Sequence, residues 1–88
     1  MTPDAPRLAP KARLKWDPRD QRYLLLYPER GLALSDTAGA ILRLCDGTHS
    51  LDAIVCELAK GRPEGDIPMI RNDVIAFLQE MQRRGLIV

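Results

Sequence analysis

The sequence predicts an α+β fold that is winged-helix-like, with a three-stranded antiparallel sheet followed by a three-helix bundle. Strand alternation and turn residues fill residues 13 to 34. Apolar stripes at helical spacing, each preceded by a capping residue, fill residues 35 to 88. A chain of 88 residues is too short to divide into two cores. We therefore expect one domain, residues 13 to 88, behind a short N-terminal arm.

The arm, residues 1 to 12, contains three prolines. We predict an extended segment with no core of its own, because proline is excluded from helix interiors and central strands. A terminus of this kind is poorly ordered unless something holds it. We expect a neighbouring chain to hold it, in a homodimer, although a crystal contact would order it equally well.

Three runs of strand-forming residues, separated by turn signals, come next. Leu14 and Trp16 alternate with charged residues, and Asp17 and Pro18 stand where a type I turn favours them. Gly31 is free to take positive φ in the second turn. The strands are expected at residues 13 to 16, 23 to 27 and 31 to 34, and the second turn at residues 28 to 31.

Three helices follow, each with a residue at its start that caps free amides and a glycine at its end. The expected N-caps are Ser35, Ser50 and Asp66, and the expected ends are Gly47, Gly61 and Gly85. After Gly85, Leu86 can fold back onto the last turn in a Schellman motif. The predicted core faces are Ala38, Ile41, Leu42 and Cys45; Leu51, Ile54, Val55 and Leu58; and Ile70, Val74, Phe77, Leu78 and Met81.

Charge and composition argue against several classes of partner. The formal net charge is +1, which gives no electrostatic case for nucleic acid or an anionic membrane. The chain has no apolar run of the length of about 18 residues that a membrane span needs, and no apolar core of a secretion signal near its start. The two cysteines, Cys45 and Cys56, are too few for a disulfide scaffold. We expect a cytoplasmic protein with neither nucleic acid nor membrane as its partner.

The inventory of reactive side chains argues against catalysis. His49 is the only histidine and has no partner at a telling spacing. No cluster of His, Cys or carboxylates matches the spacing of a metal site, and no glycine-rich phosphate loop follows a strand. We expect no enzyme activity, no cofactor and no metal. Binding of a quinone or a metal is the weakest reading, because potential ligands are so few.

Winged-helix domains are best known as DNA-binding proteins, in which the second helix of the pair enters the major groove. Here that helix carries Asp52 and Glu57 against Lys60 alone. Because phosphate contacts supply most non-specific affinity, this surface would repel DNA. A DNA-binding regulator is therefore the alternative function, not the first.

Peptide binding is the other use of such a shape. The edge of a short sheet has unpaired N–H and C=O groups, to which an extended peptide can add as another strand. The third helix offers a wall beside its core stripe, because four of its residues recur at helical spacing. An isolated exposed isoleucine is also common on ordinary surfaces. These four residues are Arg71, Ile75, Leu78 and Gln82.

Several separated strings resemble the PqqD family of pyrroloquinoline quinone (PQQ) biosynthesis, from about Arg13 to Val88. They are LLYPERGLALSDTAGAILRLCDG, LDAIVCEL and DVIAFLQEMQRRGLI, in that order. Arg30 stands where a second glycine is common in the family, and Ser35 where asparagine is common. Both departures are mild, because Gly31 remains for the turn and serine caps a helix about as well as asparagine.

The resemblance implies a non-catalytic peptide chaperone, a recognition element of a ribosomally made peptide pathway. It implies that the precursor peptide PqqA binds beside the third strand and against the third helix, and that the complex presents PqqA to the radical S-adenosylmethionine enzyme PqqE. The peptide-binding residues we expect are Gly31, Leu32, Ala33, Leu34, Arg71, Ile75, Leu78 and Gln82.

Overall fold

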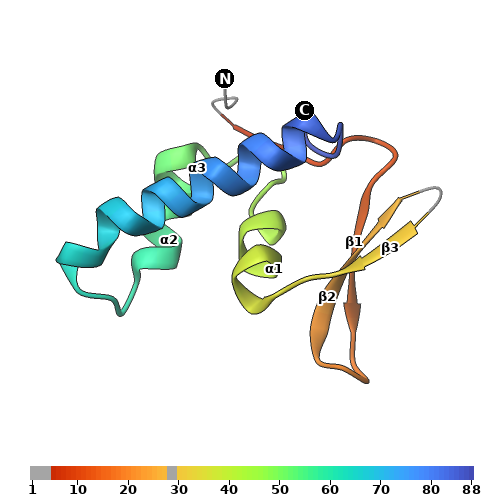
Figure 1. Ribbon diagram of the computed structural model, residues 1–88, viewed down its shortest axis with the longest axis horizontal. Coiled ribbons are helices and arrows are strands. Elements are labelled where there is room, and N and C mark those ends of the chain that lie inside the picture. The colour runs from red at the N-terminus through yellow and green to blue at the C-terminus, as the bar shows by residue number, and fades with distance from the viewer. Residues whose placement is uncertain (1–4, 28–29) are drawn as a thin grey trace.

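A computed structural model describes residues 5–27 and 30–88 (Figure 1). Its elements follow the predicted order, with the sheet first and the helices after it. The strands are β1 (Arg13–Asp17), β2 (Arg22–Tyr27) and β3 (Arg30–Ala33), antiparallel in the order β1-β2-β3. The helices are α1 (Asp36–Arg43), α2 (Leu51–Ala59) and α3 (Ile67–Arg83), with a 3₁₀ turn, η1 (Glu64–Asp66), before α3. The predicted α+β, winged-helix-like class is confirmed. Two residues of the second predicted turn, Pro28 and Glu29, lie outside the described residues.

The strand register divides the sheet into an inner and an outer face. Leu25 is fully buried and lies opposite Leu14 on β1 and Leu32 on β3. Directly opposed residues share a face, so these three leucines define the inner face. Tyr23 also lies on the inner face, where a Cβ on Gly39 of α1 would come within 2.9 Å of its ring. The helices all lie on one side of the sheet (Figure 1), and this close approach fixes α1 there.

The serine caps form as the sequence predicts. The Ser35 hydroxyl accepts from the amide of Ala38, and the Ser50 hydroxyl accepts from the amide of Ala53, each at 3.1 Å. The Schellman motif also forms, because Leu86 N–H donates to Met81 C=O at 2.9 Å while Gly85 has φ +74°.

Asp66 stands at the N-cap position of α3 as predicted, but its side chain makes no capping hydrogen bond. Its backbone is already helical, and its carboxylate accepts from Arg62 at 3.3 Å rather than capping α3. The chain enters α3 one turn earlier, through η1, so no extended residue remains at that position to act as a cap.

Helix α1 is shorter than predicted. It ends at Arg43, and the positive φ of Gly47, +84°, lies in the turn beyond it. The reason is competition for backbone groups. Cys45 C=O accepts from Leu8, and Gly47 N–H donates to Pro6 C=O, so the chain after α1 pairs with the N-terminal segment.

The N-terminal segment therefore belongs to the domain. Arg7 and Val88 exchange both backbone hydrogen bonds, and Ala9 N–H donates to Leu86 C=O at 2.9 Å. Pro6 and Ala9 are buried. Residues 5 to 12 thus pack on their own domain, and the division into an arm and a domain stays a prediction. Because backbone groups of this segment are already satisfied within the chain, its packing needs no second protomer, and the homodimer stays a prediction.

One core joins the sheet, the helices and this segment. Its members come from every helix, from β2 and from both ends of the described chain. Within the part of the chain that the structure describes, no helix is long and apolar enough to cross a membrane. The buried members are Leu25, Leu34, Ile41, Leu42, Cys45, Ile54, Val55, Ile70, Val74, Leu78, Met81, Leu86 and Ile87, together with Ala12.

We predict that Ala9→Glu destabilises the protein by about 2–4 kcal/mol, because it buries an unpaired charge at a residue only 4% exposed. Ala5→Glu is the matched control. Ala5 is exposed in the same segment, so its change should be within about 0.5 kcal/mol. Urea unfolding of both variants measures the difference. Equal stabilities would show that the segment does not pack on its own domain in solution.

Candidate functional site

β3 is one of the two edge strands of the sheet, and its outer edge is open among the described residues. Leu34 N–H donates to Tyr23 C=O at 3.0 Å, and the register places these two residues opposite one another. Bonded and non-bonded pairs alternate along an antiparallel ladder. Leu32 and Leu34 therefore direct their backbone groups to β2. Gly31 and Ala33 direct theirs outward, and among the described residues β2 is the only strand that pairs with β3.

The side chains of β3 also alternate. Leu34 is buried, and Leu32 is half-buried on the inner face. Gly31 and Ala33 lie on the outer face and are exposed. A Cβ on Gly31 would stand only 3.3 Å from Leu26 Cδ2, so a larger residue there would push on the neighbouring strand. The two residues with free backbone groups are thus the two smallest, and an added strand can approach them closely.

The predicted wall on α3 is only partly available. Leu78 is 1% exposed and packs in the core, so as a surface contact that prediction is wrong. Arg71 forms an ion pair with Asp52 of α2, so this side of α3 turns to α2 in its first half. Ile75 and Gln82 are half-buried on the same side. Leu34 and Leu78 both belong to the one buried core.

A hollow on the opposite side of α3 was not predicted. It is lined by Met69 and Asp73 of α3, Thr37 of α1, and Leu58 and Arg62 at the end of α2, above the buried Ile70 and Val74. Met69 is 53% exposed, which is unusual for a large apolar side chain. Thr37 lies four residues after Ala33, so this hollow borders the helix that continues the edge strand. The helical period places Met69 outside the core stripe of α3. A large apolar residue at such a position is the sequence signal that could have indicated this hollow.

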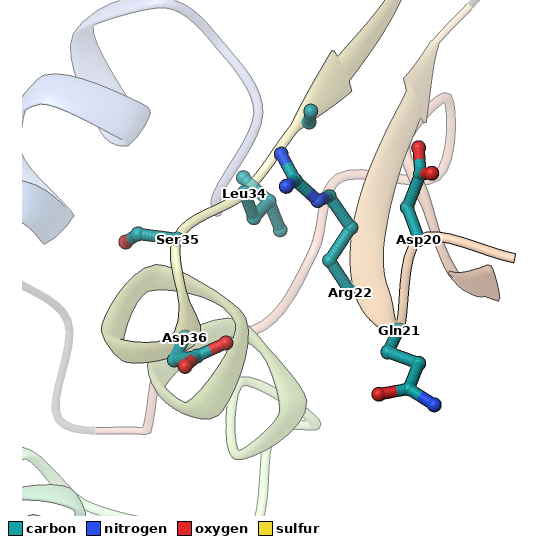
Figure 2. Close-up of a pocket in the computed structure, with 7 residues that line it drawn as sticks. Asp20, Gln21, Arg22, Leu34, Ser35 and Asp36 are labelled. Carbon is teal, nitrogen blue, oxygen red and sulfur yellow. The ribbon is translucent and has the colours of Figure 1, made fainter. Parts of the chain in front are cut away.

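A second hollow lies where β3 passes into α1. Figure 2 shows Arg22 from β2, Asp20 and Gln21 from the preceding turn, and Ser35 and Asp36 from the start of α1 around this point. Ala33 and Leu34 complete its lining. A peptide that follows the edge past Ala33 would therefore meet a polar, charged surface.

The other chemistry-bearing side chains have local roles. Burial raises the pKa of the Cys45 thiol to about 12, and its Sγ lies 3.3 Å from Ile41 C=O. Hydrogen bonds from Thr48 hold the pKa of Asp46 well below its usual range, and His49 lies 3.0 Å from the same carboxylate oxygen. Hydrogen bonds from Arg83 and Arg84 lower the pKa of Glu80 to about 2. Among the described residues, no three of His, Cys, Asp or Glu form a group that could hold a metal ion.

A small antiparallel sheet with an open edge at β3, backed by three helices, defines a winged-helix-like domain that offers a strand edge for binding. The family model described as coenzyme PQQ synthesis protein D matches residues 22–87. The chain belongs to the PqqD family.

Individual relatives agree. The chain is 41% identical over 80 residues to a PqqA binding protein of Methylococcus capsulatus, covering 91% of this chain and 83% of that one. It is 40% identical over 84 residues to a PqqA binding protein of Azotobacter vinelandii, covering 96% and 89%.

A solved structure is also similar. It is the solution NMR structure of the PqqD truncation of Methylobacterium extorquens PqqCD, described as a functional and stand-alone recognition element for ribosomally synthesised and post-translationally modified peptides. The TM-score is 0.78 at 28% identity, covering 100% of this chain and 93% of that one.

The register predicts opposite effects for two neighbouring proline substitutions. Leu32→Pro removes an amide that pairs with β2 and should destabilise the protein by about 3 kcal/mol or more. Ala33→Pro removes an amide that faces outward and should change stability by less than about 1 kcal/mol. Thermal or urea unfolding of both variants measures this. A larger loss of stability for Ala33→Pro than for Leu32→Pro would mean that Ala33, and not Leu32, directs its amide to β2.

Proposed function

We propose that this protein is a non-catalytic chaperone that binds a PqqA-type precursor peptide and presents it to the radical S-adenosylmethionine enzyme PqqE. The single observation that carries the peptide-binding step is the open edge of β3, where Gly31 and Ala33 direct unpaired backbone groups outward. The names of the relatives, PqqA binding proteins, support the identity of the peptide. The cytoplasmic location expected from the sequence remains a prediction.

Backbone pairing alone is too weak to hold the peptide. The two outward residues offer two N–H donors and two C=O acceptors. At about 1 kcal/mol net for each hydrogen bond, four bonds contribute about 4 kcal/mol, which corresponds to roughly millimolar affinity. Side-chain contacts must therefore supply the rest. The fixed pairing of β3 with β2 and the Ser35 cap reduce the ordering required of the protein when the peptide docks.

We place the apolar contacts of the peptide at the hollow bordered by Thr37, Met69 and Asp73, because that hollow adjoins α1 directly after the edge strand. The Ile75 and Gln82 side of α3 is the rival position. Its neighbour Arg71 is already engaged by Asp52, which favours the first choice.

Presentation explains why the chain needs no reactive groups of its own. Cys45 is buried with a raised pKa, and Asp46, Glu57 and Glu80 have lowered pKa values because neighbouring groups donate hydrogen bonds to them. None of these groups is poised to transfer a proton near neutral pH. We assign all covalent chemistry, and any cofactor, to the partner enzyme.

The DNA-binding alternative gains no support from α2. Its carboxylates are Asp52 and Glu57, which pair with Arg71 and Lys60 respectively. Neither cation is therefore free to contact phosphate. The absence of a nucleic-acid partner stays a prediction, and a DNA titration at two salt concentrations would test it.

We predict that Ala33→Pro weakens binding of the full-length precursor peptide at least about tenfold, a loss of about 1.4 kcal/mol, because it removes one edge amide. Ala33→Ser keeps the amide and is the matched control, which should bind within about twofold of the unmodified protein. Isothermal titration calorimetry measures both, with a scrambled peptide to report non-specific binding. Unchanged affinity for the proline variant would place the peptide elsewhere.

The wall on α3 is tested by a second pair of variants. Met69→Ser should weaken peptide binding by about 1–2 kcal/mol, through lost apolar contact, and Ile75→Ser should weaken it less. Because Ile75 is half-buried, the unfolding free energy of each variant is measured alongside its affinity. If Ile75→Ser weakens binding more than Met69→Ser, the peptide binds on the Ile75 and Gln82 side of α3 instead.

A further inference from the structure

The proposed peptide site uses the backbone edge of Gly31 and Ala33 and leaves the outer face of the sheet, where side chains project, open. Alternation places eight strand residues on it: Arg13, Lys15 and Asp17 of β1, Arg22, Leu24 and Leu26 of β2, and Gly31 and Ala33 of β3. The helices lie on the opposite side of the sheet (Figure 1). This set of eight residues is called the outer face below.

The centre of the outer face is apolar. Leu24 and Leu26 are half-buried there, beside the exposed Gly31 and Ala33. Because these two residues of β3 are small, they leave one flank of the leucines uncovered. Leu26 also borders a hollow with Arg13 and Lys15. An apolar centre with a polar rim is the usual arrangement of a protein interface.

The rim of the outer face is basic, and its cations form no ion pair within the described part of the chain. Arg13, Lys15 and Arg22 form no ion pair with any residue that the structure describes. The carboxylate among the eight, Asp17, accepts from the backbone amide of Arg19 at 3.0 Å. Asp17 lies directly opposite Arg22 and offsets part of its charge, so the charge available to a partner is mainly that of Arg13 and Lys15.

The cations of α3 are in the opposite situation. Arg71 pairs with Asp52, and Arg83 and Arg84 share Glu80. These three cations are paired with two carboxylates, so most of their charge is offset within the chain. Of the two basic surfaces, the outer face is thus the one whose cations form no ion pair among the described residues and lie beside apolar area.

We propose that the outer face docks the modifying enzyme, at a surface of that enzyme that has carboxylates around an apolar centre. This inference rests on the proposed function, because it names the surface for the presentation step. A second copy of this chain is a poor occupant, since a two-fold contact would bring the same three cations together. The peptide occupies the edge of the sheet and the enzyme its outer face, so both can bind at once.

The size of the outer face sets the kind of complex. Three strands about 4.8 Å apart and five residues of about 3.3 Å each give a surface of roughly 200 Å². A stable interface buries about 800 Å² on each partner. The outer face is therefore the charged centre of a transient contact, whose association is fast and sensitive to salt.

The test is the double variant Arg13→Glu/Lys15→Glu, on the strand farthest from the peptide edge. Its matched control is Lys11→Glu/Arg43→Glu, which makes the same change in net charge at exposed residues away from the outer face. Two affinities are measured by surface plasmon resonance: that for the precursor peptide, and that of the peptide complex for purified PqqE. Each is measured at about 50 and 300 mM salt, on either side of the physiological screening range.

We expect the double variant to bind the enzyme at least about tenfold more weakly at low salt while binding the peptide within about twofold. The control should lose less than about threefold for the enzyme. Equal losses for the two variants, or none for either, would overturn the docking surface and leave the peptide site standing.

Two further outcomes separate this inference from the proposed function. If the unmodified protein binds the peptide but never the enzyme, presentation fails and the docking surface fails with it. Phosphatidylglycerol vesicles are the second probe. If they bind the unmodified protein and not the double variant, while both proteins bind the enzyme equally, the outer face is a membrane contact instead.

Discussion

The pairing of β3 with β2 is the constraint on which the rest of the molecule depends. One hydrogen bond, from Leu34 N–H to Tyr23 C=O at 3.0 Å, fixes the phase of the ladder at its end. From that phase it follows that Leu32 and Leu34 bond inward and that Gly31 and Ala33 face outward. A slip of one residue would also exchange the buried leucines with the exposed small residues, so core burial and edge exposure enforce the same register.

The same register separates the functions that we propose. Backbone groups of Gly31 and Ala33 point along the plane of the sheet, toward a new strand. The side chains of Arg13, Lys15 and Arg22 stand perpendicular to it, on the face away from the helices. One small sheet can thus offer a peptide an edge and a protein a face. The helices contribute stability and a wall, and their own charges are largely compensated by neighbours on the same or the adjacent helix.

Local chemistry was predictable from the sequence, and long-range competition was not. The serine caps and the Schellman turn involve residues within five positions, so their signals are read directly. The Asp66 side chain does not cap α3 because the backbone there is already helical, and its carboxylate accepts from Arg62 instead. The sequence did not reveal where α1 ends or that the N-terminal segment packs on its own domain. The reason is that Pro6 and Leu8 pair with residues near position 46 and at the C-terminus. The helical period predicts the direction of each side chain around the axis of α3, but not which element packs on each side of the helix. The hollow at Met69 was therefore missed.

The most direct test of the central claim is amide hydrogen exchange of β3, followed by NMR with and without the precursor peptide. The register predicts that Gly31 and Ala33 exchange quickly in the free protein, whereas Leu32 and Leu34 are protected. The peptide should then protect Gly31 and Ala33 and leave the other two unchanged. If peptide binding is saturable but Gly31 and Ala33 still exchange at their free rates, the peptide does not add to this edge, and the account of recognition is wrong.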